Sequence, residues 1–441
     1  MLGIVLLSIS GGLLALEAVN YFYYKRTVNF VNQKTLDIYD NKMDKEWLKN
    51  YWIIKLSPDD IKEWIMKTLC YNNGSTCNNL DDYSAIPRSK MLKWIAYHVY
   101  FKSFKKLNED EVLEAEKILE CIEKKIEFKF LDYETLISNN ILKEYLDNLN
   151  ILKFGNSKIE TSYKPMIIYT TLNTVKNISY LYLKQLGFIK LKMPKTGMVY
   201  FYYKNKEHNE KTTIFIHGLG FGITPYLSFI KSLTLTNDVI VPILPNISNM
   251  EFHSIFTSFD NQVFFPQYDD IRHDFFQVLN NHDLYNVTVI GHSFGTIILA
   301  LLLKYDQFKK RINKTIFIDP VCFIDDYHKI LNYIKNPDDK GSLLVSAFNN
   351  IIYKDVYVRY ATQRFLYGPE YWIYDYNILT NNTHVLLSSD DKIVPSNTIH
   401  KKLMQHNIPC MYIETASHAD VFSSNEFSDV ISVLNNIVSL N

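Results

Sequence analysis

From about residue 188 to the carboxyl terminus, short apolar runs alternate with amphipathic stretches, and this alternation most restricts the fold. Apolar strands that alternate with helices are typical of a parallel sheet covered on both faces. Strands are predicted at 188–193, 198–204, 212–217, 239–244, 286–291, 315–319, 385–389 and 410–414. The first two are separated by a turn-type segment at 194–197, which predicts a hairpin. We therefore expect an α/β fold with a mostly parallel sheet.

The chain divides into regions of different pattern. Residues 1–26 form a hydrophobic segment, residues 27–163 a helical accessory region, and residues 164–441 carry the sheet. Within the last region, residues 323–380 interrupt the alternation with helical and aromatic-rich pieces, at the place where a substrate-covering cap would be inserted. The chain is 47% hydrophobic and 15% aromatic, which is enough to bury a large core.

Local start signals predict several helices in the accessory region. Ser57 and the segment 58–60 form a cap and an acidic first turn, and Asn108 with Glu111 is typical of a capping box. His98 lies on a Trp- and Tyr-rich helix, where we expect it to be packed rather than catalytic. We find no site chemistry in this region.

Charge and cysteine content exclude several kinds of function. Lys plus Arg and Asp plus Glu each number 47, whereas nucleic-acid-binding proteins carry a basic excess. The five cysteines show neither C-x-x-C spacing nor a histidine at ligand spacing. We therefore expect no nucleic-acid partner, no metal site and no cofactor.

The pentapeptide Gly291-His292-Ser293-Phe294-Gly295 stands between an apolar strand and a helix predicted at 296–305. This is the context of a nucleophile elbow, a sharp turn that lifts a serine hydroxyl clear of the sheet. The turn is strained at Ser293, and Gly291 and Gly295 leave the space that a Cβ would fill. The following helix supplies backbone N–H groups and a partial positive charge. Ser293 is thus the predicted nucleophile.

A serine hydroxyl needs a base that takes its proton, and the base needs a carboxylate that orients it. In this architecture the order along the chain is nucleophile, acid, base. His418, after the last predicted strand, fits the base, and Asp391, four residues before Pro395, fits the acid. Asp390 and Asp319 are alternatives for the acid, since both follow predicted strands.

Two backbone N–H groups are needed to stabilise the negative charge that develops on the substrate oxygen. One is predicted at Phe294, directly after the nucleophile, and the other at Leu219, in a glycine-rich loop after strand 212–217. The loop reads His217, Gly218, Leu219, Gly220, Phe221 and Gly222. Its glycines allow amides to turn inward, and we expect its histidine to orient the loop. The spacing matches neither a dinucleotide-binding nor a phosphate-binding loop.

With these residues the chain resembles the α/β-hydrolase superfamily from about Lys211 to its end. Within the superfamily it is similar to mostly uncharacterised, membrane-anchored α/β-hydrolases of fungi and large DNA viruses. The shared features are Leu186-Gly187-Phe188, Thr196-Gly197, the His217 loop with Pro225-Tyr226, Gly291 to Gly295, Asp319-Pro320-Val321-Cys322-Phe323, Asp391-Lys392-Ile393-Val394 and His418-Ala419. The resemblance implies an α/β-hydrolase fold with a Ser-Asp-His triad and a cap, and it implies no substrate.

The predicted function is that of a serine hydrolase, first of all a carboxylesterase or lipase acting on a lipid-like or apolar ester. The aromatic segment 365–372 in the cap region favours an apolar substrate. An acyltransferase, amidase or thioesterase would use the same triad. A catalytically inactive binding protein with this fold is the alternative of another class.

The amino-terminal segment predicts membrane association. Residues 2–16 carry no charge, and if Glu17 is tolerated, residues 2–24 are long enough to span a bilayer. The aromatic residues 21–24 and the basic pair Lys25-Arg26 would form the interfacial flank. We therefore expect a single anchor with a cytosolic catalytic domain. A signal peptide for the secretory pathway and a buried or surface-lying helix are the alternatives.

Overall fold

The computed structural model of the chain comprises two compact units, residues 1–33 with 158–441 and residues 34–157, and each is described by itself. The residues described are 2–33, 57–71, 83–100, 102–138, 143–151, 158–206, 211–248, 266, 268–323, 351–364, 371–373, 375–379, 382–423 and 428–439.

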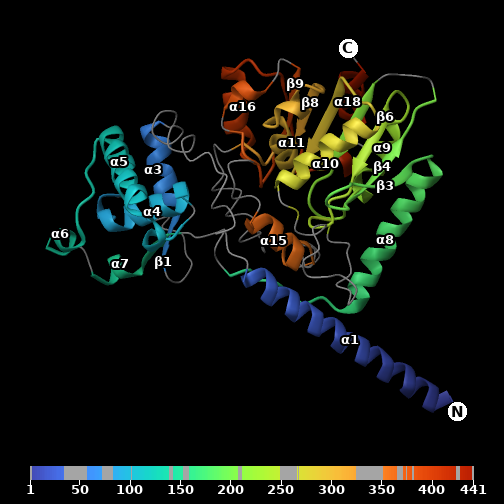
Figure 1. Ribbon diagram of the computed structural model, residues 1–441, viewed down its shortest axis with the longest axis horizontal. Coiled ribbons are helices and arrows are strands. Elements are labelled where there is room, and N and C mark those ends of the chain that lie inside the picture. Colours follow the sequence, from blue (N-terminus) through green and yellow to red (C-terminus); the bar gives the residue numbers. More distant parts are fainter. Residues whose placement is uncertain are drawn as a thin grey trace. The chain divides into compact units, whose positions relative to one another are not determined.

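The larger unit is built on an eight-stranded sheet with the order β10-β9-β8-β7-β5-β6-β4-β3 (Figure 1). The strands are β3 (Ile189–Lys192), β4 (Val199–Tyr203), β5 (Thr212–Ile216), β6 (Asp238–Pro242), β7 (Val287–His292), β8 (Ile312–Ile318), β9 (Thr383–Ser388) and β10 (Cys410–Ile413). β4 is antiparallel to both of its neighbours, and the pairs from β6 to β10 are parallel. This is the α/β-hydrolase fold, as the sequence predicted.

Helices cover both faces of the sheet because the connections run in opposite directions. The chain moves from β5 to β6 through α9 (Leu227–Leu233), and then returns across the sheet to β7 through α10 (Tyr268–Asn281). Right-handed crossovers in opposite directions place their helices on opposite faces. The remaining helices of this part are α11 (Gly295–Leu303), α12 (Asp306–Lys309), α16 (Ser396–Gln405), α17 (Asp420–Ser423) and α18 (Ser428–Ser439).

The core of this unit lies around the central strands. All residues of β5, β6 and β7 are buried, and so is every residue of α11, which is apolar throughout after Thr296. Because the strands from β6 to β10 are parallel, their carboxyl ends lie at the same edge of the sheet, where ligands bind in open α/β sheets. The predicted site residues follow β5, β7, β9 and β10 at this edge.

The hairpin at the other end of the sheet is fixed by a buried carboxylate. Asp274 of α10 accepts hydrogen bonds from the backbone N–H groups of Lys195 and Thr196, each at 2.8 Å, and from the Thr196 hydroxyl at 2.6 Å. Gly197 then turns with a φ of +73°, a conformation that glycine adopts without steric cost. The predicted turn at 194–197 is therefore present.

The expected cap at 323–380 falls largely outside the described residues, which in this stretch are 323, 351–364, 371–373 and 375–379. They include α15 (Val356–Arg364) and a short 3-10 helix, η10 (Tyr376–Ile378). Of the aromatic segment 365–372, only Tyr371 and Trp372 are described, and both are buried.

The smaller unit is helical with one short ribbon. Its helices are α3 (Pro58–Lys67), η3 (Tyr83–Ala85), α4 (Arg88–Tyr100), η4 (Phe104–Lys106), α5 (Glu109–Ile126), α6 (Tyr133–Ser138) and α7 (Lys143–Asn148). The predicted capping box of Asn108 and Glu111 begins α5. The antiparallel ribbon of β1 (Leu69–Tyr71) and β2 (Leu149–Ile151) was not predicted, because three residues are too few to show a strand period.

The prediction of an amino-terminal membrane anchor is wrong. Residues 2–33 form one helix, α1 (Leu2–Gln33), and no helix within the described residues is long and apolar enough to cross a membrane. With the anchor, the inferred membrane association and the cytosolic placement lose their basis. The helix continues for seven residues beyond the basic pair Lys25-Arg26 and ends at Gln33.

Polar contacts explain why α1 departs from the expectation. The carboxylate of Glu17 accepts hydrogen bonds from the Met166 N–H at 3.0 and 3.2 Å and from the Tyr163 hydroxyl, and so caps α8 (Met166–Gln185). Asn20 and Tyr24 also bond the segment before α8, through Tyr163 and Thr161.

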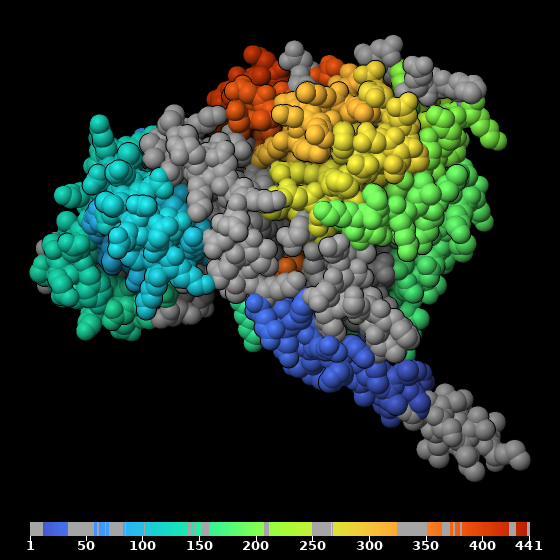
Figure 2. Space-filling view, in the orientation of Figure 1, coloured from blue at the N-terminus to red at the C-terminus, as the bar shows by residue number. Residues whose placement is uncertain are grey.

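One face of α1 is therefore buried against its own unit. The buried residues recur at helical spacing and are Asn20, Tyr24, Thr27 and Val31. The opposite face carries exposed Leu14 and Phe22, and Figure 2 shows residues 12–33 as a dark-blue surface at the border of this unit. The hydropathy of the segment reflects its apolar side chains and gives no sign of the polar contacts made by the buried face of the helix.

Candidate active site

The turn at Ser293 has the geometry of a nucleophile elbow. β7 ends at His292 and α11 begins at Gly295, so only two residues connect strand to helix. Ser293 has a φ of +50°, a left-handed conformation that non-glycine residues rarely adopt. Its N–H donates to the carbonyl of Ile318 in β8 at 2.9 Å, which holds the strained residue in place.

The two flanking glycines are required by space. A Cβ on Gly295 would lie 2.2 Å from the carbonyl oxygen of Ile216, and a Cβ on Gly291 would lie 3.0 Å from that of Gly295. Both contacts involve backbone, which cannot rotate away. Any side chain at Gly295 would therefore push the elbow off the end of β5.

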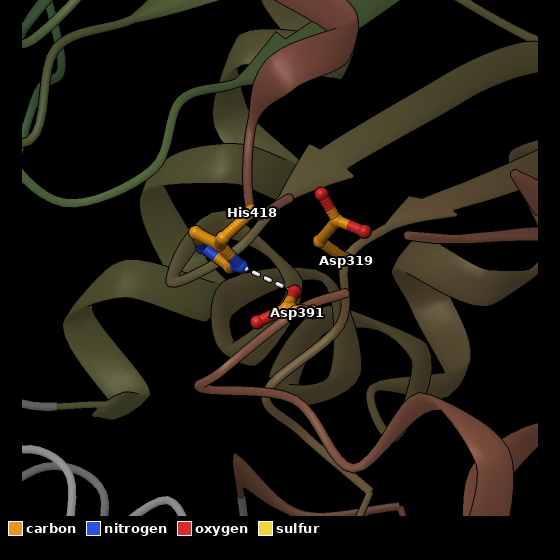
Figure 3. A group of neighbouring side chains, drawn as sticks. All are labelled: Asp319, Asp391 and His418. Atoms are coloured by element: carbon orange, nitrogen blue, oxygen red, sulfur yellow. Dashed lines mark hydrogen bonds and ion pairs between the residues drawn. The ribbon is translucent and has the colours of Figure 1, made fainter. Parts of the chain in front are cut away.

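The structure brings Ser293, His418 and Asp391 together. His418 Nε2 lies 2.8 Å from Ser293 Oγ, and His418 Nδ1 lies 2.6 Å from Asp391 Oδ2. Figure 3 shows the imidazole directed at Asp391. The side chain of Asp391 is fully buried, whereas that of His418 is 19% exposed. The acid is sealed from solvent while the histidine remains accessible.

The backbone after β9 fixes the orientation of Asp391. Its Oδ1 accepts hydrogen bonds from the N–H groups of Ile393 at 2.8 Å and Val394 at 2.9 Å, which leaves Oδ2 for His418. The neighbouring Asp390 is exposed and accepts from the Ser389 hydroxyl at 3.2 Å. The geometry thus distinguishes the two adjacent aspartates, which the sequence left open.

Asp319, the other alternative for the acid, is buried beside the pair (Figure 3). It accepts from the Ser388 N–H at 2.9 Å and hydroxyl at 3.1 Å, and from the Ala419 N–H at 3.1 Å. Burial, reinforced by the charge of Asp391, raises the pKa of Asp319 against the opposing effect of His418. Asp319 thereby joins β8, β9 and the loop that carries His418.

The ligand atoms of Asp319, Asp391 and His418 lie within 4.8 Å of one another, a spacing at which a cation could bind. The atoms that face inward are already engaged, since His418 Nδ1 bonds Asp391 and the Asp319 oxygens accept from Ser388 and Ala419. The arrangement therefore fits a histidine oriented by a carboxylate better than a metal centre.

The electrostatics suit a base. Burial lowers the pKa of His418, but the charge and hydrogen bond of Asp391, with the charges of Asp319 and Asp420, outweigh it and raise the pKa above 6.5. A general base works best when its pKa lies near the working pH.

The loop after β5 is held by a buried histidine. His217 Nε2 accepts from the Leu244 N–H at 3.1 Å, so its Nδ1 carries the proton that bonds the Gly218 carbonyl at 2.8 Å. Burial lowers the pKa of His217 to about 4. Since both nitrogens are occupied, His217 is placed to orient the loop.

Within this loop the N–H groups of Gly218 and Gly220 are used, by the Tyr226 hydroxyl at 3.2 Å and the Ile247 carbonyl at 2.9 Å. The N–H groups of Leu219 and Phe294 donate to no group among the described residues. Gly220 reaches this arrangement with a φ of +126°. These are the two donors that the sequence predicted for the oxyanion.

Sequence reasoning missed the roles of Tyr226 and Thr296. Tyr226 bonds both Gly218 and His292, and the Thr296 hydroxyl donates to the Ser293 carbonyl at 2.6 Å and accepts from the Val321 N–H at 3.1 Å. The only signal for Tyr226 was the Pro-Tyr pair shortly after the glycine-rich loop.

No protein-family model matches this sequence, and no curated protein matches it significantly. Similar solved structures include a candidate lipase from Acinetobacter baumannii, at 14% identity and a TM-score of 0.43, covering 60% of this chain and 96% of that chain. A membrane phospholipase A described as a bacterial virulence factor is 13% identical, with a TM-score of 0.44, and the match covers 62% of this chain and 94% of that chain. A carboxylesterase from the thaumarchaeon Nitrososphaera gargenis is 16% identical, with a TM-score of 0.40, and the match covers 57% of this chain and 99% of that chain. The strand order of this chain, rather than these low identities, defines its fold.

Proposed function

We propose that this protein is a serine hydrolase with Ser293 as nucleophile, His418 as base and Asp391 as acid. The observation that carries the proposal is the continuous hydrogen-bonded path from the Ser293 hydroxyl through His418 to Asp391, at 2.8 and 2.6 Å. A serine hydroxyl becomes a strong nucleophile only when such a base takes its proton. The left-handed backbone of Ser293 supports the same role, since strain of this kind concentrates at reactive positions.

In the proposed reaction Ser293 Oγ attacks the carbonyl carbon of an acyl substrate while its proton moves to His418 Nε2. Asp391 stabilises the imidazolium, and the N–H groups of Leu219 and Phe294 bind the oxyanion. The imidazolium then gives its proton to the leaving alcohol, and the acyl group remains on Ser293. Water, deprotonated by His418, releases the acid in a second passage through the same states.

We propose a carboxylic ester as the substrate class, with an apolar acyl or alcohol part. The aromatic composition of the segment 365–372 supports an apolar substrate, and its two described residues, Tyr371 and Trp372, are buried. Acyl transfer, amide hydrolysis and thioester hydrolysis would use the same groups. The narrower resemblance to fungal and viral hydrolases stays a prediction.

A panel of p-nitrophenyl esters with acyl chains of increasing length tests this function. Wild-type protein should hydrolyse them, and Ser293→Ala should lower turnover by at least about 10³-fold. Ser228→Ala, at an exposed serine of α9, is the matched control and should behave as wild type. Equal turnover in Ser293→Ala would remove the serine mechanism. If the wild-type protein hydrolyses neither esters, thioesters nor amides, the alternative of a catalytically inactive binding protein would be favoured.

A further inference from the structure

A buried chain of hydrogen bonds joins the oxyanion loop to the elbow through two residues outside the triad. The Gly218 N–H donates to the Tyr226 hydroxyl at 3.2 Å, and that hydroxyl lies 2.8 Å from His292 Nδ1. Tyr226 is 4% exposed and His292 2% exposed. His292 directly precedes Ser293, so the chain links the two sides of the oxyanion site.

The charges around His292 set the direction of this chain. Burial, with the nearby His418 and His217, keeps the pKa of His292 well below 6.5, so the ring is neutral. Its Nε2 has no hydrogen-bond partner among the described residues and faces Asp319 Oδ2 at 3.9 Å. A proton on Nε2 is attracted by that carboxylate, whereas a lone pair there would be repelled. His292 Nδ1 therefore accepts, and the Tyr226 hydroxyl donates to it while accepting from Gly218.

The contact leaves little freedom for the loop. A Cβ on Gly218 would lie 2.8 Å from His292 Nδ1, 3.0 Å from the Tyr226 hydroxyl and 3.1 Å from Ser293 Cβ. The Gly218 backbone is thus pressed against the Tyr226–His292 pair and the nucleophile at once. Because Leu219 is the next residue, a shift of Gly218 moves the Leu219 N–H as well.

The phenol ring of Tyr226 is itself immobilised. It packs edge-on against Phe215 of β5 at 5.1 Å and against Phe422 of α17 at 4.9 Å between ring centroids. Phe422 lies four residues after His418, so the same aromatic cluster supports the loop that carries the base. Tyr226 can therefore fix the position of the oxyanion loop relative to the elbow.

We propose that Tyr226 and His292 are positioning residues that align the oxyanion loop, so that the Leu219 N–H meets the negative charge formed at the substrate carbonyl. This inference rests on the proposed serine hydrolase function. It assigns to the pair an effect on the transition state rather than on substrate binding. Loss of the pair should therefore lower kcat and leave KM nearly unchanged.

The experiment first separates the inference from the function on which it rests. Wild-type protein that fails to react with a fluorophosphonate at Ser293 and to hydrolyse p-nitrophenyl butyrate would overturn both. If Ser293 is active, Tyr226→Phe should lower kcat about 10- to 100-fold with KM within about twofold, since loss of one oxyanion donor costs about 10²–10³-fold. Tyr200→Phe is the matched control. Tyr200 lies in strand β4, and the variant also removes a Tyr–His hydrogen bond, the 3.0 Å contact between the Tyr200 hydroxyl and His282 Nε2. A Tyr226→Phe variant with the kcat of Tyr200→Phe would overturn the inference alone.

A second pair of variants keeps the test decisive if Tyr226→Phe folds poorly. His292→Asn places an acceptor oxygen near the position of Nδ1, whereas His292→Leu offers none. We expect His292→Asn to keep kcat within about threefold of wild type and His292→Leu to lower it about 10-fold or more, with KM unchanged in both. Equal kcat in the two variants, or a loss that falls on KM, would contradict the positioning role.

Discussion

The edge of the large sheet and the helical unit both bury histidines, but they surround them differently. At the sheet edge, His217 bonds the backbone with both nitrogens and His292 bonds Tyr226. In the helical unit, His98 lies among the rings of Trp94 and Tyr97, and its Nε2 bonds to no group in the part of the chain that the structure describes. Burial lowers the pKa of His217 to about 4 and that of His98 to about 3. Burial alone therefore keeps a histidine neutral in either place.

His418 differs from these histidines by having a carboxylate partner. The charge and hydrogen bond of Asp391 reverse the effect of burial and raise the pKa of His418. The partner of a histidine, rather than its burial, therefore distinguishes a histidine that can act as a base from one that only packs. Each of the following variants changes a partner or a packing contact and so tests this distinction.

The largest effect is expected from removing the partner of His418. Asp391→Asn should lower kcat by about 10³–10⁴-fold, because the amide no longer stabilises the imidazolium and favours the wrong tautomer. The acidic limb of kcat/KM should also move to lower pH, since Asp391 raises the pKa of the base. Ester hydrolysis from pH 4 to 9 measures both. Asp390→Asn is the control, and a larger loss there than in Asp391→Asn would reassign the acid.

The backbone at the sheet edge offers the next test. Gly295→Ala should cost about 3 kcal/mol of stability or prevent folding, because the new Cβ meets the Ile216 carbonyl oxygen at 2.2 Å. Gly12→Ala in α1, where a Cβ meets no described atom within 4 Å, should be neutral or stabilise by up to about 1 kcal/mol. Urea unfolding compares the two, and similar midpoints would contradict the close packing of the elbow.

His98→Leu should make the helical unit less sensitive to acid. The folded state keeps His98 neutral, with a pKa of about 3, whereas the unfolded chain takes up a proton below pH 6.5. His98 should therefore lower the free energy of unfolding by about 1 kcal/mol for each pH unit below 6.5. His98→Leu should lack this pH-dependent loss. Urea midpoints at pH 7 and pH 5, followed by tryptophan fluorescence, measure the slope.

The exposed His273 provides the control for this slope. His273→Leu should keep the acid sensitivity of wild type, because its ring is 47% exposed. An unchanged slope in His98→Leu would show that His98 finds a polar partner in solution and would remove the contrast with the sheet edge.

Glu17 sharpens the comparison from the other side, because it is a partnered carboxylate that does not join the Ser293–His418–Asp391 path. Glu17→Ala should cost about 1 kcal/mol by uncapping α8 and should leave kcat unchanged. Thermal unfolding and ester turnover measure the two effects. Glu120→Ala, at an exposed position of α5, should change neither. A loss of turnover in Glu17→Ala would mean that α1 acts on the site.

The elbow and the mostly parallel character of the sheet were predictable because their signals are local. Ser293 stands between an apolar strand and a helix within a few residues, and the alternation of strands and helices repeats along the chain. His418 and Asp391 followed from their order after the nucleophile. The choice of Asp391 over Asp390 and Asp319 as the acid required the geometry, because the hydrogen bonds from the Ile393 and Val394 N–H groups orient Asp391 toward His418.

The nature of α1 and the place of Tyr226 could not be read from the sequence, because both depend on partners far along the chain. Glu17 meets Met166 after 149 residues, and Tyr226 meets His292 after 66. Hydropathy treats Glu17 as an interruption of an apolar run, although it serves as a cap for another helix. A single tyrosine after a loop likewise gives no sign of the histidine it will bond.

Labelling with a fluorophosphonate probe tests most directly whether the Ser293–His418–Asp391 path makes a reactive serine. The probe needs no knowledge of the substrate, and intact mass with peptide mapping locates the adduct. We expect one adduct on Ser293, none in Ser293→Ala and slower labelling in Asp391→Asn. A wild-type protein that stays unlabelled, or an adduct on another serine, would contradict this expectation.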